Sequence, residues 1–181
     1  MQRKQTGFTI IELVVVIILL GILAATALPR FMDVGDEAHT AVVEGVLGSL
    51  QTGVSLYHAQ WIAEGEPAAN TQINEFNNLR ANAAGFPYGT ADNSGGTSTV
   101  TTSADCEAVF DGILQAGAPS SSSVAAVGNV AGSLTDFTLV QAAPNCRMFY
   151  TAQNNQVGQT VPELVYDSAL GVVTQTTFVL P

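Results

Sequence analysis

The sequence predicts an α+β protein in which one long N-terminal helix packs on a C-terminal antiparallel sheet of about four strands. Three observations predict this class. An apolar run lies near the N-terminus, apolar residues then continue at helical spacing, and four alternating stretches rich in β-branched and aromatic residues lie near the C-terminus. A helix followed by a run of strands is typical of α+β proteins. The 181 residues suffice for one globular head beyond the first helix.

Residues 8–28 predict a transmembrane helix. Of these 21 residues 17 are apolar, whereas charged residues make up only 11% of the chain. A helix of this length spans about 30 Å, the thickness of the hydrocarbon layer of a bilayer. Arg3 and Lys4 precede the run and Arg30 follows it. The positive-inside tendency therefore predicts a cytoplasmic N-terminus, with residues 30–181 on the other side of the membrane.

Glu12 interrupts this apolar run near its start. A carboxylate is costly in hydrocarbon and is tolerated when it finds a partner or takes up a proton. One interpretation is a neutral glutamate near the headgroups of an ordinary anchor. The other is that Glu12 pairs with a cation from another subunit.

An ordinary secretory signal is an alternative interpretation of the same stretch, because Ala25-Thr26-Ala27 has the form of an A-x-A cleavage site. Three features weigh against it. The apolar run exceeds the usual length of about 7–15 residues, Glu12 interrupts it, and Pro29 lies two residues after the cut.

Beyond Pro29 the pattern becomes one-sided, which predicts that the helix continues as an amphipathic segment to near Ala63. Gly65 and Pro67 are its stop signals. A helix of this length measures about 85 Å, so its first half is expected to project from the head, with a bend at Pro29. Apolar or small residues recur in steps of three and four at Phe31, Val34, Ala38, Val42, Val46, Leu50, Val54, Tyr57 and Trp61.

The remaining residues, 66–181, predict a globular α+β head. Asp105 is expected to cap a short helix that ends near Gln115. Residues 89–104 and 116–133 are rich in serine, threonine, glycine and other small residues, which is typical of surface loops. The expected strands are residues 135–141, 146–152, 162–167 and 172–179, with a turn at 168–171 between the last two.

The charge and the motifs argue against nucleic-acid binding and against enzymatic activity. The net charge is −10, from 15 acidic and 5 basic residues, whereas nucleic-acid binding requires basic residues. No glycine-rich phosphate loop or metal-binding signature occurs, and no cofactor is expected. The acidic cluster Asp33, Asp36 and Glu37 is interpreted as a solvated helix face on which Arg30 pairs with Asp33. Asp92-Asn93-Ser94-Gly95 is only a weak calcium candidate.

The segment Lys4-Gln5-Thr6-Gly7-Phe8-Thr9-Ile10-Ile11-Glu12-Leu13 closely resembles the processing site of type IV pilins. The resemblance implies that residues 1–7 are a leader, which a prepilin peptidase removes between Gly7 and Phe8. It also implies N-methylation of Phe8 and a subunit-docking role for Glu12. Pro29 matches a helix-kinking proline of many members, whereas Ser49 stands where some members carry a second proline.

A second resemblance is to pilins of the mannose-sensitive haemagglutinin (MSHA) type. It rests on residues 29–33, 59–61 and 146–150. It implies a Gram-negative bacterium and a fimbrium, a surface pilus used for cell adhesion, of which this chain is a structural subunit. The alternatives are a minor pilin, a pseudopilin of a type II secretion system, and a monomeric membrane-anchored binding module.

The family resemblance also implies partners and a location. The expected partners are copies of the chain and other pilins, the prepilin peptidase, and an inner-membrane assembly platform with its ATPase. Before assembly the chain is expected in the inner membrane with its head in the periplasm, and afterwards in an extracellular pilus. The expected domains are the leader, the filament-core helix at 8–28, the amphipathic helix at 29–65 and the head at 66–181.

Cys106 and Cys146 are the only cysteines. The expected orientation places both outside the cytoplasm, where disulfides persist. Many type IV pilins have a comparable disulfide-bounded region, here residues 106–146. We therefore expect a disulfide, and two buried free thiols are the alternative.

Overall fold

The computed structural model describes residues 8–91 and 98–181, with side chains at all of these positions except 29–33. The predicted leader, including Gly7, and the calcium candidate at 92–95 lie outside the described residues, and so do the side chains of the proposed Arg30–Asp33 pair. The chain forms two compact units, residues 1–41 and 42–181, which are considered separately below.

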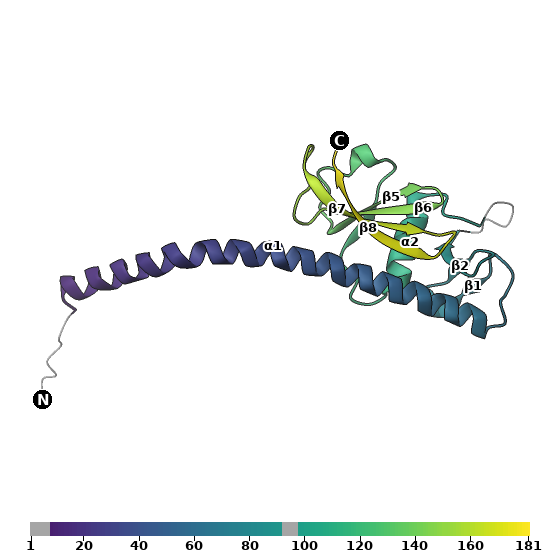
Figure 1. Ribbon diagram of the computed structural model, residues 1–181, viewed down its shortest axis with the longest axis horizontal. Helices are drawn as coiled ribbons and strands as arrows, with labels where there is room; N and C mark the ends of the chain where they lie inside the picture. Colours follow the sequence, from purple (N-terminus) through teal and green to yellow (C-terminus); the bar gives the residue numbers. More distant parts are fainter. Residues whose placement is uncertain (1–7, 92–97) are drawn as a thin grey trace, which may run out of the picture. The chain divides into compact units, whose positions relative to one another are not determined.

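The first unit contains the beginning of α1, a helix that runs over Ile10–Ala63 and ends in the second unit (Figure 1). Its first 19 residues, Ile10–Leu28, are long and apolar enough to cross a membrane, and no part of this stretch is buried. The predicted helix is thus confirmed. It is continuous through Pro29, and the bend expected there stays a prediction.

The part of α1 in the second unit buries one stripe of side chains in the core. Within this part of α1 the predicted stripe was wrong at one position, because Val43 is buried whereas Val42 is 41% exposed. In the first unit the predicted positions Val34 and Ala38 are exposed as well. The helix ends at Ala63, as expected, and Gly65 just beyond it, one of the predicted stop signals, adopts a positive φ of 87°. Spaced three or four residues apart, the buried side chains are Val43, Val46, Leu50, Val54, Tyr57 and Trp61.

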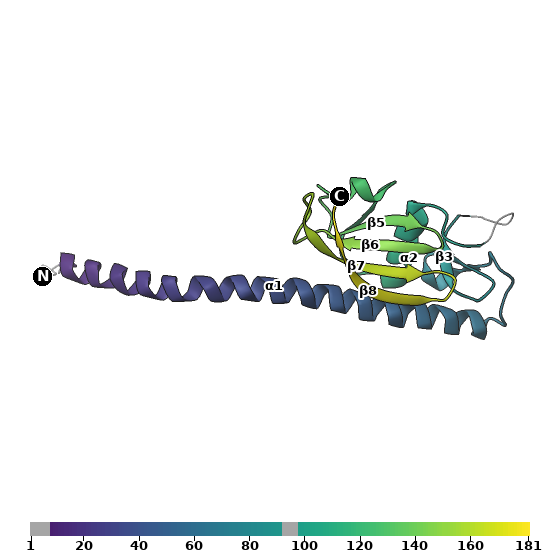
Figure 2. The same ribbon diagram turned by 45° about the horizontal axis from the view of Figure 1, so that its top comes forward.

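The main sheet of the head has five strands in the order β4-β5-β6-β7-β8, and Figure 2 shows β5 to β8 side by side. Its four antiparallel strands match the four predicted ones to within a few residues. They are β5 (Phe137–Ala142), β6 (Asn145–Tyr150), β7 (Thr160–Asp167) and β8 (Val172–Val179). The fifth strand, β4 (Ser121–Ser123), pairs with β5 in parallel, so the sheet is mixed.

A second, three-stranded antiparallel sheet was not predicted. It consists of β1 (Gln72–Ile73), β2 (Leu79–Ala81) and β3 (Pro87–Gly89). A single 3-10 turn, η1 (Asn74–Phe76), connects the first two strands. Strands of two or three residues are too short to show an alternating pattern, which is why the sequence did not indicate them.

Helix α2 (Ser103–Leu114) corresponds to the predicted short helix, but its cap differs from the prediction. Thr102 is the N-cap, and Asp105 is the third helical residue, whose carboxylate accepts a hydrogen bond from the Thr102 backbone N–H at 2.9 Å. The helix packs closely on α1 at Gly53. A Cβ there would lie 2.5 Å from Cγ2 of Ile113, so this crossing requires glycine.

The five-stranded sheet has apolar side chains on both faces. Successive residues of a strand point to opposite faces, and Met148 belongs to the main core whereas Phe149 belongs to a smaller second cluster. The second cluster also contains the buried Val130. Residues 116–133 were therefore not entirely a surface loop as predicted, because they contain β4, the 3-10 turn η2 (Val127–Asn129) and this core residue.

Candidate functional site

The first candidate site is the N-terminal end of α1, where the sequence places processing and docking. Phe8 is 87% exposed, and Ile10 and Ile11 are also exposed. Gly7, on the other side of the expected cut, lies outside the described residues. The described part of the site is therefore an exposed apolar end with one carboxylate, Glu12.

Glu12 and Thr9 cap the first turn of α1 reciprocally. The Thr9 backbone N–H and hydroxyl donate to Oε2 of Glu12 at 2.8 and 2.7 Å, and the Glu12 backbone N–H donates to the Thr9 hydroxyl oxygen at 3.3 Å. This arrangement is a capping box, which satisfies two backbone donors that a helix start otherwise leaves unpaired. The prediction for Glu12 missed this role, although the spacing Thr9-x-x-Glu12 is its sequence signal.

The capping box engages only one of the two carboxylate oxygens. Oε1 of Glu12 accepts no hydrogen bond from the described residues, and the whole side chain is exposed. A carboxylate has about four acceptor positions on its two oxygens. The geometry therefore leaves Glu12 able to bind a cation while its helix remains capped.

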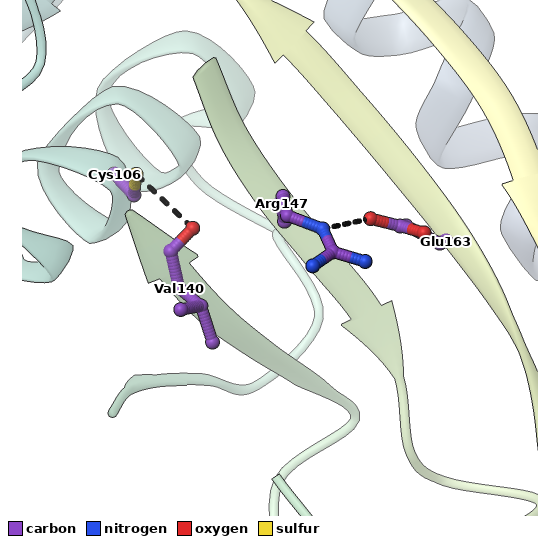
Figure 3. A network of polar contacts seen from close by, with 4 residues as sticks. All are labelled: Cys106, Val140, Arg147 and Glu163. Atoms are coloured by element: carbon purple, nitrogen blue, oxygen red, sulfur yellow. Dashed lines mark hydrogen bonds and ion pairs between the residues drawn. The ribbon is translucent and has the colours of Figure 1, made fainter. Parts of the chain in front are cut away.

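The head contains the predicted disulfide. Cys106 of α2 and Cys146 of β6 are joined, with 5.4 Å between their Cα atoms, and both residues are fully buried. The Cys106 Sγ lies 3.9 Å from the carbonyl oxygen of Val140 on β5 (Figure 3). The cross-link thus fixes α2 against the centre of the sheet, from which the surface loops extend.

A cluster around Arg147 on the other face of the sheet was not foreseen. Arg147 on β6 forms an ion pair with Glu163 on β7, and Figure 3 shows its guanidinium directed towards that carboxylate. The guanidinium carbon also lies 4.9 and 4.6 Å from the ring centres of Phe149 and Phe178. Because Glu163 is only 3% exposed, the arginine compensates a buried charge. These contacts join residues of three strands, so spacing along the chain did not indicate them.

The rest of the described chain includes histidine, aspartate and glutamate side chains, which ligate metals where they are clustered. No group of three histidine, cysteine, aspartate or glutamate side chains there could hold a metal. His58 stacks between Trp61 and Phe86, with its Nδ1 3.3 Å from the Gly85 carbonyl oxygen. Asp36 and Glu37 are exposed on α1. These residues have roles in packing and solvation.

The N-terminal part of the chain matches a known protein family. The prokaryotic N-terminal methylation motif matches residues 2–28. Over this segment the chain is similar to proteins that carry an N-terminal methylation motif. The motif covers the expected leader junction, Phe8 and Glu12. None of the solved structures matches the chain.

Three relatives illustrate the similarity. A type II secretion system core protein G of Pseudomonas aeruginosa is 39% identical over 56 residues, 31% of this chain and 39% of that protein. A type IV narrow pilus major component of Thermus thermophilus is 37% identical over 67 residues, 37% of this chain and 56% of that protein. A type IV major fimbrial protein of Dichelobacter nodosus is 42% identical over 74 residues, 39% of this chain and 44% of that protein.

The chain therefore matches about two fifths to just over half of the length of these relatives. The relatives are named for pili, fimbriae and a secretion system rather than for an enzymatic activity. The three alignments cover 31–39% of this chain, so most of the chain lies outside them.

Proposed function

We propose that this chain is the structural subunit of a type IV pilus, cleaved after Gly7, N-methylated on Phe8 and assembled through α1 into a surface filament. The observation that carries the proposal is the stretch Ile10–Leu28, whose apolar side chains are exposed along its whole length. Such a surface requires a bilayer before assembly and other apolar helices after it. A helix that meets both requirements can leave the membrane for a filament core.

Glu12 supplies the register in this proposal. Cleavage after Gly7 creates a cationic amine on Phe8 within the apolar layer. The free Oε1 of Glu12 on a neighbouring subunit is suited to accept it, while Oε2 stays engaged with Thr9. Two charges that are costly when separate then form one pair. Helices that slip along each other lose this pair, so Glu12 would select one stagger between subunits.

The head supports a role outside the cell. Its disulfide joins two buried cysteines, and disulfides persist in oxidising compartments. Residues 29–181 carry 14 of the 15 acidic side chains but only 3 basic ones. We infer a periplasmic head before assembly and an outward-facing acidic filament surface afterwards. The MSHA-like subtype and adhesion belong to this proposal and rest on residues 29–33, 59–61 and 146–150.

The partners of the proposal follow from its mechanism. Removal of the leader requires a prepilin peptidase. Extraction of an apolar helix from a membrane requires energy, for which an assembly platform and its ATPase are proposed, and the filament contains further copies or other pilins. We infer that Pro29 bends α1 after the apolar stretch, where the helix leaves the membrane.

A pseudopilin of a type II secretion system is the second candidate function. The similarity to a type II secretion system core protein G, 39% identical over 56 residues, favours it. A minor pilin and a monomeric anchored module remain further alternatives. Immunogold labelling distinguishes these candidate functions. A major pilin is labelled along the whole surface fibre, whereas a minor pilin is labelled mainly at the end of the fibre. A pseudopilin depends on the secretion machinery, and an anchored module forms no fibre.

The docking role of Glu12 is tested by comparing Glu12→Ala with Glu44→Ala, a matched variant at an exposed glutamate of the same helix. We expect Glu12→Ala to be inserted in the membrane at a normal level but to yield at least tenfold fewer sheared filaments. Glu44→Ala should keep filament yield within about twofold of the parent. Normal filaments from Glu12→Ala would overturn the docking role.

A further inference from the structure

A polar hollow in the head is not explained by assembly through α1. It lies where β5 begins and β6 ends, between residues 133–136 and residues 151–155. Its volume is about 250 Å³, and it is open to solvent. It is lined by Ser133, Leu134, Thr135, Asp136, Thr151, Ala152 and Asn155.

The hydrogen-bond donors of the lining are largely used within the protein. The Thr135 hydroxyl donates to the Phe137 carbonyl at 3.0 Å, and the Thr151 hydroxyl donates to the Thr135 carbonyl at 2.8 Å. The Asn155 amide Nδ2 donates to the Ser133 carbonyl at 3.0 Å. The Ser133 hydroxyl lies 3.0 Å from the Thr135 hydroxyl, with which it shares a hydrogen bond. A ligand in this hollow therefore meets few donors.

Acceptors, in contrast, remain available. Asp136 uses Oδ2 to accept from the backbone N–H and the hydroxyl of Ser120, at 3.0 and 2.7 Å. Its Oδ1 accepts no hydrogen bond within the described part of the chain, and the same holds for Oδ1 of Asn155. Carboxylate and amide oxygens are strong acceptors. The hollow therefore presents one negative charge and several oxygen lone pairs.

Among the described residues, the ion pair that the structure contains joins Arg147 and Glu163. No basic side chain of these residues therefore neutralises Asp136. The charge of Asp136 affects the neighbouring Tyr150. Burial, and secondly this carboxylate, raise the pKa of the Tyr150 hydroxyl. The acidic composition of the head strengthens the negative potential around the hollow.

We propose that this hollow binds the ammonium group of a primary amine, with Asp136 and Asn155 accepting its N–H donors and Leu134 contacting its alkyl part. Leu134 is completely exposed at the rim, so its side chain is available to the alkyl part of a ligand. An ammonium has three donors and no acceptor, so it complements a site whose own donors are used. This proposal does not depend on filament assembly.

Other small ligands fit less well. A neutral polyol requires donors from the protein as well as acceptors, and most donors of the lining are engaged. Calcium takes about 6–8 oxygen ligands and favours several carboxylates, whereas Asp136 is the single carboxylate of the lining. The volume is below the range of about 300–1,000 Å³ typical of drug-sized ligands, so one amine-bearing group fills it.

Two sources supply such an ammonium group, a lysine side chain of another protein and an amino sugar. The test is a titration of the isotope-labelled full-length chain in detergent micelles, followed by NMR shifts of the amides of residues 133–136 and 151–155. The amine probes are Nα-acetyl-lysine methylamide, pentylamine and glucosamine. The neutral controls are pentanol and glucose, and calcium chloride tests for a metal site.

We expect saturable shifts with a millimolar Kd for the amine probes, and binding at least tenfold weaker for the neutral controls. Asp136→Asn should weaken amine binding at least tenfold, because the charge is lost while an amide oxygen still accepts from Ser120. The matched control is Asp111→Asn, which removes the same charge from a carboxylate bonded to the Ser121 hydroxyl outside the hollow. It should change the Kd less than twofold.

A substitution of Leu134 tests the apolar part of the site. Leu134→Ser, at a fully exposed position, should weaken the two alkyl amines more than glucosamine and should not affect folding. Tighter binding of the lysine probe than of glucosamine would assign a protein partner, and the reverse order an amino sugar. Any of four results would overturn the proposal. They are equal binding of pentylamine and pentanol, a preference for calcium, unchanged amine binding by Asp136→Asn, and no saturable shift with any amine.

Discussion

Thr9 and Glu12 cap the first turn of α1 reciprocally, with Oε2 of Glu12 2.8 Å from the Thr9 backbone nitrogen and 2.7 Å from its hydroxyl oxygen. The same glutamate is the proposed docking carboxylate, so in the proposal one side chain serves both its own helix and a neighbour. The two roles use different oxygens. Thr9 therefore holds Glu12 at the helix end, where the proposal places its ion pair with the Phe8 amine of a neighbouring subunit.

The capping box predicts different effects for two substitutions of Thr9. Thr9→Val removes the hydroxyl and should raise the exchange rate of the Glu12 backbone amide about fivefold, because that amide loses its acceptor. Thr9→Ser keeps the hydroxyl and should leave the rate within about twofold of the parent. Amide hydrogen exchange of the full chain in detergent micelles measures both. Equal exchange in the two variants would contradict a capping role.

The disulfide predicts a large loss of stability when both of its cysteines are replaced. The cross-link joins residues 40 positions apart, and closing a loop of this size stabilises a fold by about 4 kcal/mol. The Cys106→Ser, Cys146→Ser double variant should lose about that free energy of unfolding. Urea titration followed by the fluorescence of Trp61, the only tryptophan, measures it. An unchanged urea midpoint would show that the cross-link adds nothing to the packing around it.

The Arg147–Glu163 pair predicts a non-additive mutant cycle. Arg147→Met leaves the buried carboxylate of Glu163 without its cation and should cost about 3 kcal/mol of unfolding free energy. Adding Glu163→Gln removes the stranded charge, so the double variant should recover most of that loss. Urea titration of the parent, both single variants and the double variant gives the coupling. Additive losses would mean that the two side chains act independently.

The buried tyrosines predict a loss of stability at alkaline pH. Burial raises the pKa of the Tyr166 hydroxyl well above its ordinary value of 10.0, and Tyr57 shifts in the same direction. The folded chain keeps these protons longer than the unfolded chain. Their contribution is therefore complete below pH 10 and is lost as the pH rises above it, by up to about 1.4 kcal/mol per tyrosine and pH unit.

Tyr166→Phe tests this pH dependence. It removes the hydroxyl that donates to the Pro87 carbonyl at 2.7 Å, so it should lower stability at every pH. It should also flatten the decline above pH 10, because one titrating group is gone. Urea titrations at pH 8, 10 and 11 compare the slopes. A slope equal to that of the parent would show that Tyr166 ionises as readily in the folded chain as in the unfolded one.

The parts of the fold that follow a regular period were predictable from the sequence. The helical spacing and the stop signals after it predicted that α1 ends near Ala63, its last residue, and alternation predicted β5 to β8 to within a few residues. β4 consists of three serines and has no such alternation, so it was missed. The hollow beside Asp136 was also missed, because it forms only when β5 and β6 pair and bring residues 133–136 and 151–155 together.

Mass spectrometry of the N-terminal peptide from filaments sheared off the cell surface tests the central claim most directly. The proposed processing and assembly predict that this chain is a major component of the filaments and begins with N-methylated Phe8. A chain that begins at Leu28, as after an ordinary signal peptidase, or at Met1, or that is absent from the filaments, would contradict the account.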